Sequence, residues 1–140
     1  MRVLFDTNIV LDFLLERELF FPEALALFTA HDQQKIDAFV SGITPVNVFY
    51  IIPKEAGLQK ATEAVLAILD TLDVCLIDKQ ILEEAVKLPI LDYEDAVQIA
   101  SALNAKIAAI VTRDVKDFQH SPIPVYSPTD FIALLNATNQ

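Results

Sequence analysis

The sequence contains very little glycine and no low-complexity run, so it offers no obvious flexible linker. Only two of its 140 residues are glycine, and no segment repeats another. A chain of this length can bury roughly two-thirds of the surface that its unfolded form exposes. We therefore expect one domain, spanning residues 1–140, around one core.

Cysteine is nearly absent, which excludes a framework of internal disulfides. The single cysteine, Cys75, lies in the apolar run 74–77, and one thiol cannot form a bridge within the chain. Because no histidine is near it in sequence, we interpret Cys75 as a buried structural thiol rather than a nucleophile. His31 and His120 fall at element ends or in loops, which favours surface positions over zinc ligation.

Long hydrophobic runs are also missing, although 54% of the residues are hydrophobic and the mean hydropathy is +0.41. No stretch reaches the roughly 18 to 20 uninterrupted apolar residues of a membrane span. Asp6 interrupts the apolar start too early for a signal peptide. We therefore expect a cytoplasmic protein without membrane contact, and the apolar content favours a sheet covered by helices.

Positive charge is scarce: ten basic residues stand against twenty acidic ones, which gives a formal net charge of -10. This balance opposes the basic surface expected of a general nucleic-acid binder. Any contact with nucleic acid must then be local or assisted. Clustered carboxylates can hold metal ions that invert the local field, so the net charge alone decides nothing.

Short β-prone runs alternate with helical patterns along the chain. The β-prone runs are residues 2–5, 37–40, 74–77, 107–111 and 123–126. This alternation predicts an α/β fold of three layers, with a mainly parallel central sheet of about five strands wrapped by helices.

Capping residues and prolines mark several of the expected helices. Helix starts are predicted at Pro22, Thr44-Pro45, Asp78, Asp92 and Ser127-Pro128. Pro53 is expected to kink or end the helix that begins near Thr44, because its ring removes one N–H from the ladder.

Three aspartates stand where chemistry is expected in such a fold. Ligands bind outside the carboxyl ends of parallel strands, and Asp6 and Asp114 each follow a predicted strand. Asp95 lies in the first turn of a predicted helix, from which it can reach the same crevice. Its neighbour Glu94 is about 100° around that helix and is expected to face solvent. Asp6 has a plainer interpretation as well, as a turn former or helix cap.

Converging carboxylates repel one another, so such a cluster needs a compensating charge. Two carboxylates ~4 Å apart at an effective dielectric near 20 repel by about 4 kcal/mol, which calls for a cation or for raised pKa values. Mg²⁺ and Mn²⁺ prefer oxygen ligands and keep several waters, and one water can attack phosphorus. The pattern therefore predicts a divalent-metal site for phosphodiester hydrolysis.

Four segments are distinctive in their order and spacing: LFDTN at 4–8, VSGIT at 40–44, DYEDA at 92–96 and VTRDVKDF at 111–118. Together they resemble the PIN-domain family of metal-dependent ribonucleases, which includes the toxins of many bacterial toxin-antitoxin pairs. The resemblance covers nearly the whole chain. It implies an endoribonuclease that uses Mg²⁺ or Mn²⁺ to cut RNA, with an antitoxin protein as partner and a homodimeric state.

The resemblance also assigns roles to individual residues. It implies that Asp6, Asp95 and Asp114 are the catalytic, metal-binding acids, with Asp117 as a further metal ligand. Thr7, Asn8 and Thr112 match positions that would orient these acids or the phosphate.

One position departs from the family pattern. Where most catalytically competent members carry a glutamate, a few residues after segment 40–44, this chain has Asn47. An amide oxygen can coordinate a metal but brings no negative charge, so the affinity for the ion should fall. Asn47 has an alternative interpretation as a first-turn helix residue after a cap at Thr44.

Two other classes of function compete with the ribonuclease. A non-catalytic relative that binds RNA or a protein is favoured by Asn47. A phosphatase or receiver domain with Asp6 as nucleophile fits less well, because the phosphatase needs a second acid where Asn8 stands. A receiver domain needs an acidic pair at the first strand end, which the sequence lacks.

The apolar helical segments 9–15 and 24–28 bear on the oligomeric state. They offer a dimer face, or they pack on the sheet of their own chain. We expect the second for most of their apolar residues.

Overall fold

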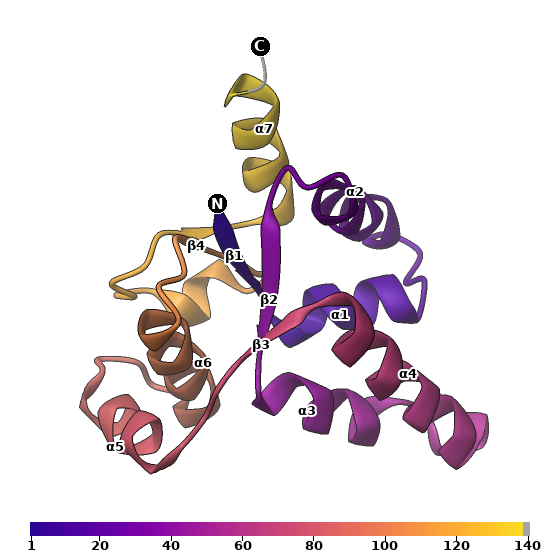
Figure 1. Cartoon of the computed structure of the whole chain (residues 1–140), viewed down its shortest axis with the longest axis horizontal. Helices are drawn as coiled ribbons and strands as arrows, with labels where there is room; N and C mark the ends of the chain where they lie inside the picture. Colours follow the sequence, from indigo (N-terminus) through magenta and orange to yellow (C-terminus); the bar gives the residue numbers. More distant parts are fainter. Residues whose placement is uncertain (139–140) are drawn as a thin grey trace.

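Five short strands form a parallel sheet at the centre of the molecule, in a computed structural model that describes residues 1–138 (Figure 1). The strands are β1 (Arg2–Phe5), β2 (Asp37–Ser41), β3 (Asp73–Cys75), β4 (Ala109–Val111) and β5 (Val125–Tyr126). Their order is β3-β2-β1-β4-β5, and every neighbouring pair is parallel. The predicted three-layer α/β fold with a parallel sheet of about five strands is confirmed.

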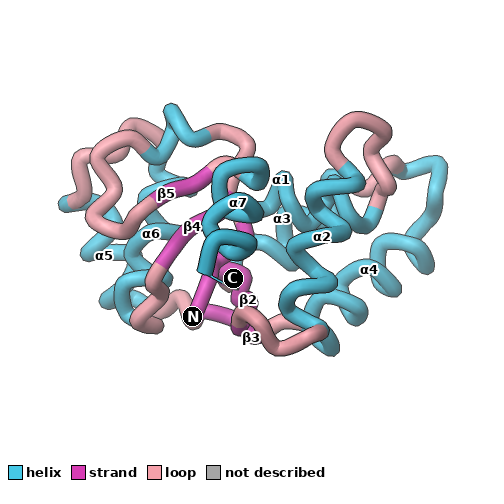
Figure 2. The backbone as a smooth tube through the Cα atoms, turned by 90° about the horizontal axis from the view of Figure 1, so that it is seen from above, coloured by secondary structure: helices cyan, strands magenta, loops and turns pink. Residues whose placement is uncertain are grey.

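Helices cover both faces of this sheet. They are α1 (Thr7–Leu14), α2 (Phe21–Asp32), α3 (Ile43–Ile51), α4 (Gly57–Thr71), α5 (Lys79–Lys87), α6 (Tyr93–Asn104) and α7 (Pro128–Thr138), with short 3₁₀ turns η1 (Lys54–Ala56) and η2 (Val115–Phe118). Figures 1 and 2 show α5 and α6 on one side and α1 to α4 on the other, with α7 beside α2. Within residues 1–138, no helix combines the length and apolar content needed to cross a membrane.

The side chains of β1 point alternately to the two faces of the sheet, and both faces are buried, which explains why the strand is apolar throughout. Val3 and Phe5 are fully buried in the core shared with α1, α2 and α7. Leu4 is fully buried in a second core, where it packs with Ile99 of α6. Successive side chains of a strand point to opposite faces, so a sheet covered on both faces needs an apolar residue at every position.

The apolar helical segments 9–15 and 24–28 pack mainly within their own chain. Ile9, Val10 and Leu27 belong to the core around β1, whereas Leu25 remains 44% exposed. Most of their apolar residues thus contact the interior of their own chain, as we expected.

The predicted helix caps are correct at three positions and wrong at one. Asp78, Asp92 and Ser127 each accept a hydrogen bond from the backbone N–H three residues later. Thr44 does not cap α3, which begins at Ile43. Its buried hydroxyl instead forms a hydrogen bond with the Thr7 hydroxyl of α1, a partner distant in sequence. The helix does end before Pro53, as predicted.

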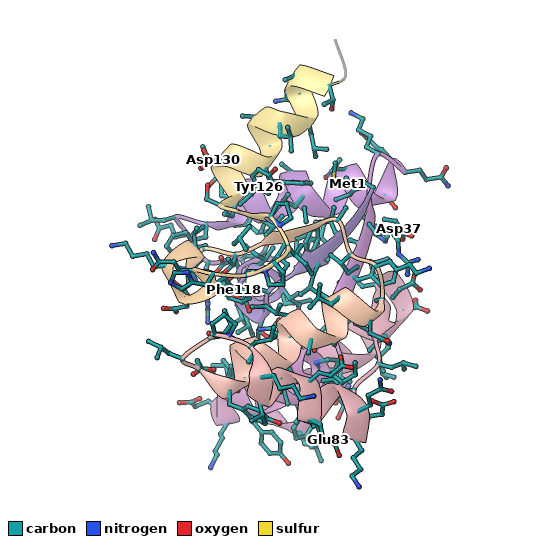
Figure 3. The ribbon with its side chains drawn as sticks, turned by 90° about the vertical axis from the view of Figure 1, so that its left-hand side faces the viewer. Met1, Asp37, Glu83, Phe118, Tyr126 and Asp130 are labelled. Atoms are coloured by element: carbon teal, nitrogen blue, oxygen red, sulfur yellow. The ribbon has the colours of Figure 1, made fainter. Side chains whose placement is uncertain are left out.

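The chain reverses its direction of travel across the sheet between β1 and β4. From β1 it moves outward through β2 to β3 and then returns to β4 on the other side of β1. Figure 3 shows Met1 and Asp37, at the amino ends of neighbouring strands, on one side of the molecule and Phe118, which ends η2, on the other. The carboxyl ends of β1 and β4 therefore flank the crevice in which such sheets bind ligands.

Candidate active site

Asp6 is held rigidly at the carboxyl end of β1. It is 7% exposed. Its Oδ1 accepts hydrogen bonds from the Thr7 backbone N–H (2.6 Å) and from Gln98 Nε2 (2.9 Å), and its Oδ2 accepts one from Thr112 Oγ1 (2.7 Å). A carboxylate offers about four acceptor positions. Three donors therefore fix the group while leaving Oδ2 able to accept a further partner.

Asp114 is connected to Asp6 through two polar side chains. Asn8 Nδ2 donates to Asp114 Oδ2 (3.1 Å), and the Asp114 backbone N–H donates to Thr112 Oγ1 (3.0 Å). Thr112 in turn donates to Asp6. The predicted supporting residues Asn8 and Thr112 thus join the ends of β1 and β4, although the Asp114 carboxylate itself is exposed.

Asp95 lies in the first turn of α6, beside the cap formed by Asp92. Partial burial, and after it the carboxylates of Asp6, Asp92, Asp117 and Glu94, together raise the pKa of Asp95 from 3.8 to about 7. The charges of Asp95 and Asp6 are therefore close enough to affect one another. Ionising Asp95 is unfavourable below about pH 7, and a nearby positive charge would favour it.

The described residues do not form a ready-made cage of acids. Within residues 1–138, no three His, Cys, Asp or Glu side chains are grouped closely enough to hold a metal ion by themselves. Asp114 is also not among the groups that raise the pKa of Asp95. Mg²⁺ nevertheless suits such a site, because it is usually bound by one or two carboxylates together with waters and substrate phosphates. A common site for Asp6, Asp95 and Asp114 remains a prediction.

Asn47, where the family pattern has an acid, faces α6. Its Nδ2 donates to Oε1 of Glu94, which is exposed as the sequence predicted. Asn47 therefore contacts the residue immediately before Asp95. The position reserved for an acid by the family pattern thus lies against the opening turn of the helix that carries a predicted metal ligand.

Thr7 contributes to the site through its backbone rather than its side chain. Its N–H donates to Asp6, whereas its hydroxyl pairs with Thr44 at 3.0 Å. The contact orients α1 against α3. The predicted supporting role therefore divides into a backbone contact to the acid and a side-chain contact between two helices.

Sequence reasoning missed Gln98, which is 1% exposed and contacts Asp6 directly. It lies in the stretch of α6 from Ala96 to Ala102, in which every residue is buried. Helical spacing gave no signal for this burial, because position 98 is about 200° around the helix from Ala96. Its partner is 92 residues away in the chain, so the sequence could not supply the contact.

Asp12 was also missed, although an acid within the apolar segment 9–15 signals a buried charge. It is 1% exposed and accepts from Arg113 Nε (2.6 Å) and Nη2 (3.2 Å) and from Arg17 (3.3 Å). The Arg113 guanidinium also stacks 3.8 Å from the Phe20 ring centroid. This arrangement ties α1 to the segment that carries Asp114.

The cysteine and one histidine have structural roles. Burial raises the pKa of the Cys75 thiol to about 11, which keeps it protonated at neutral pH and unsuited to act as a nucleophile. His31 accepts from the Ala38 backbone N–H at Nδ1 and donates from Nε2 to the Thr71 carbonyl (2.8 Å). It is half-buried between α2, β2 and α4 rather than free on the surface.

A family model described as a PIN domain matches residues 2–116, which includes Asp6, Asp95 and Asp114. The chain belongs to the PIN domain family. No curated protein matches it significantly.

Solved structures resemble this PIN domain over most of its length. A toxin-antitoxin complex from Klebsiella pneumoniae is 28% identical, covering 90% of this chain and 97% of the other, with a TM-score of 0.66. DNA-bound VapBC from Salmonella typhimurium is 17% identical, covering 91% and 98%, with a TM-score of 0.71. VapC20 of Mycobacterium tuberculosis, a toxin that cleaves the sarcin-ricin loop, is 13% identical, covering 84% and 95%, with a TM-score of 0.66. The last two likenesses concern the fold alone.

Proposed function

We propose that this PIN domain is a Mg²⁺- or Mn²⁺-dependent endoribonuclease that hydrolyses phosphodiester bonds in RNA. The observation that carries the proposal is the Asp6 carboxylate, fixed by three donors at the switch point of the sheet. Burial and the neighbouring carboxylates, Asp6 among them, raise the pKa of Asp95 to about 7. Such perturbed pKa values are typical of functional sites, and a bound cation would offset the repulsion between the acids.

Asp6, Asp95 and Asp114 would hold the ion, with Asp117 as a further ligand. When bound, Mg²⁺ or Mn²⁺ supplies Lewis-acid activation of the attacking water and neutralises charge on the phosphate. Asp6 is buried and held by three hydrogen bonds, which suits it to fix the position of the ion. Asp114 is exposed and is oriented by Asn8, which suits it to the side open to substrate.

RNA binding has to overcome the formal net charge of -10. A bound divalent ion reverses the local field at the acids. Beside them, a cavity of about 340 Å³ lies between the loop before α6 and η2, lined in part by Leu91, Lys116, Asp117 and His120. Lys116 adds positive charge next to Asp117, so this cavity is the best candidate to receive a nucleotide next to the cleaved bond.

We further propose that an antitoxin protein and a second copy of the chain are the partners. The Klebsiella relative was solved as a toxin-antitoxin complex, which supports an antitoxin. The acidic site would accept a basic segment of such a partner. If the chain is a toxin, its expression alone should arrest growth of a bacterial host, and an Asp6→Asn variant should not.

A non-catalytic RNA- or protein-binding module is the second candidate. Two observations favour it: Asn47 brings no charge to the site, and residues 1–138 hold no ready-made group of three metal-binding side chains. Such a module would bind RNA without cutting it.

A cleavage assay separates the two candidates. The wild-type chain should cut end-labelled single-stranded RNA with Mg²⁺ or Mn²⁺ and stop on chelation. Asp6→Asn should lose at least about 100-fold in rate, whereas Asp70→Asn, an exposed acid on α4, should remain active. RNA that is bound but never cut would favour the binding module, and cleavage that survives exhaustive chelation would rule out the metal mechanism.

A further inference from the structure

Gln98 is a buried polar residue whose hydrogen bonding is only half satisfied. It is 1% exposed, and its Nε2 donates to Asp6 Oδ1 at 2.9 Å. Its Oε1 is buried without a hydrogen-bond partner, alone in this among the buried side-chain polar atoms of the described residues. A buried carbonyl without a partner destabilises a fold, so Gln98 is a poor choice for packing alone.

The orientation of the amide follows from its neighbour. Turning the amide over would put Oε1 against Asp6 Oδ1, and two acceptors cannot share a hydrogen. Asp6 therefore holds Nε2 towards itself and leaves Oε1 facing the interior. The hydrogen bond from Nε2 to Asp6 is therefore kept, and Oε1 is left without a hydrogen-bond partner.

Helix α6 brings both an acid and this donor to the site. Asp95 and Gln98 are three residues apart, and residues at this spacing share a face of a helix. Asp95 and Asp6 are both carboxylates brought to the same site, and like charges repel. The N–H donated by Gln98 attracts the Asp6 carboxylate. The other two donors to Asp6 come from Thr7 and Thr112, outside α6.

We propose that Gln98 is a positioning residue, which clamps the Asp6 carboxylate to α6 and so fixes Asp6 relative to Asp95 for metal binding. This inference rests on the proposed function. The Gln98–Asp6 hydrogen bond then serves metal binding and not only packing. Without it, repulsion between the two acids would let α6 and Asp6 move apart, which would lower the affinity for the ion.

Ser101 provides a matched control on the same helix. It is fully buried one turn beyond Gln98, it donates to the backbone carbonyl of Gln98 (2.8 Å), and it forms a hydrogen bond with the Ser41 hydroxyl (3.2 Å). None of these contacts involves an acid. Ser101→Ala therefore removes buried hydrogen bonds without removing the clamp.

The test compares Mn²⁺ binding by calorimetry in the wild type, Gln98→Met and Ser101→Ala, with thermal unfolding of each metal-free protein. Methionine keeps the length and volume of glutamine without the amide. Gln98→Met should bind Mn²⁺ roughly 10- to 100-fold more weakly, the usual effect of losing a group that orients a metal ligand. Ser101→Ala should bind within about twofold of wild type, although it should unfold at a lower temperature. If Gln98→Met does not fold, Gln98→Asn, which is too short to reach Asp6, replaces it.

Each outcome decides the inference. Equal Mn²⁺ affinity in Gln98→Met and wild type overturns the positioning role but leaves the nuclease proposal intact. If neither wild type nor variant binds Mn²⁺, the proposed function fails. The crystal structure of metal-free Gln98→Met then decides the clamp: a rotated Asp6 side chain supports it, and an unmoved one overturns it.

Discussion

At the scale of single residues, Asp6 combines two roles that sequence reasoning had treated as alternatives. Its Oδ1 caps α1 by accepting from the Thr7 N–H, while Oδ2 accepts from Thr112 across the crevice. A cap occupies only one oxygen, so the second remains available for the site. The same residue therefore fixes the start of α1 and the position of the candidate ligand.

The Asp6→Asn variant should lose cleavage but keep its fold. An asparagine Oδ1 can still accept from Thr7 and Gln98, and the Thr112 hydroxyl can turn to accept from the new amide. Removing one charge also relieves the repulsion of Asp95. We expect metal-free Asp6→Asn to unfold at the same temperature as wild type or higher. A cleavage assay alongside thermal unfolding checks this, and an unfolded variant would show that Asp6 is a structural residue.

Asn47→Glu should change metal affinity and metal-free stability in opposite directions. The new carboxylate would lie against Glu94, which now accepts from Asn47, and like charges in a half-exposed contact destabilise by about 0.5 kcal/mol. With metal, one more charge near Asp95 should tighten binding by ~1 to 3 kcal/mol. Calorimetric Mg²⁺ titration and urea unfolding measure the two effects.

The neutral variant Asn47→Gln is the control, because it retains an amide and adds no charge. If Asn47→Glu alters neither quantity while Asp95→Asn alters both, position 47 is outside the site. The departure from the family pattern would then carry no information about activity.

At the scale of elements, the Asp12–Arg113 pair fastens α1 to the segment after β4. Arg113 is next to Asp114 in the sequence, and its Nε and Nη2 both donate hydrogen bonds to Asp12. Breaking a buried pair by removing one partner leaves an uncompensated charge. Arg113 therefore stabilises the frame of the site.

Arg113→Met should destabilise the protein by about 3 kcal/mol, the low end for a broken buried pair, because Arg17 still contacts Asp12. Arg17→Met should have a smaller effect, since Arg17 makes one contact at 3.3 Å whereas Arg113 makes two. Urea unfolding of both variants measures the difference. The interpretation would be wrong if Arg17→Met were the more damaging substitution.

The sequence allowed the elements to be predicted better than their connections. The five strands and the caps at Asp78, Asp92 and Ser127 depend on neighbouring residues. The caps are where they were predicted, and each predicted strand overlaps an observed one, although β3 is shifted towards the amino end and β4 and β5 are shorter than predicted. Periodicity could not give the contact of Gln98 with Asp6 or of Thr44 with Thr7, since the partners lie 92 and 37 residues apart. Such contacts arise only when the sheet brings distant strand ends together.

At the scale of the whole molecule, the fold brings negatively charged acids close enough to repel one another, in a chain that already carries a formal net charge of -10. High net charge destabilises the compact state by self-repulsion, and the site adds to this locally through Asp95. A bound cation would relieve both. The stability of the metal-free protein should therefore depend on pH in a way that metal reverses.

Asp95 determines the sign of that dependence. Its pKa is about 7 in the folded protein, against an ordinary value of 3.8, so between these values the folded state binds more protons than the unfolded state. Stability contributed by Asp95 is then full below about pH 4 and is lost as pH rises towards 7. Metal binding needs the ionised carboxylate, so affinity for Mn²⁺ should rise over the same interval.

We therefore expect metal-free wild type to lose stability between pH 4.5 and 7.5, roughly the interval spanned by the two pKa values, and Asp95→Asn to lose less, because asparagine does not titrate. Self-repulsion among the other acids is common to both proteins and cancels in their difference. Added Mn²⁺ should raise the unfolding temperature of wild type more at pH 7.5 than at pH 4.5, and should barely affect Asp95→Asn at either. Thermal unfolding across pH, with and without Mn²⁺, measures all four curves. Parallel metal-free curves for the two proteins would mean that Asp95 titrates normally and is not held against Asp6, which would remove it from the proposed site.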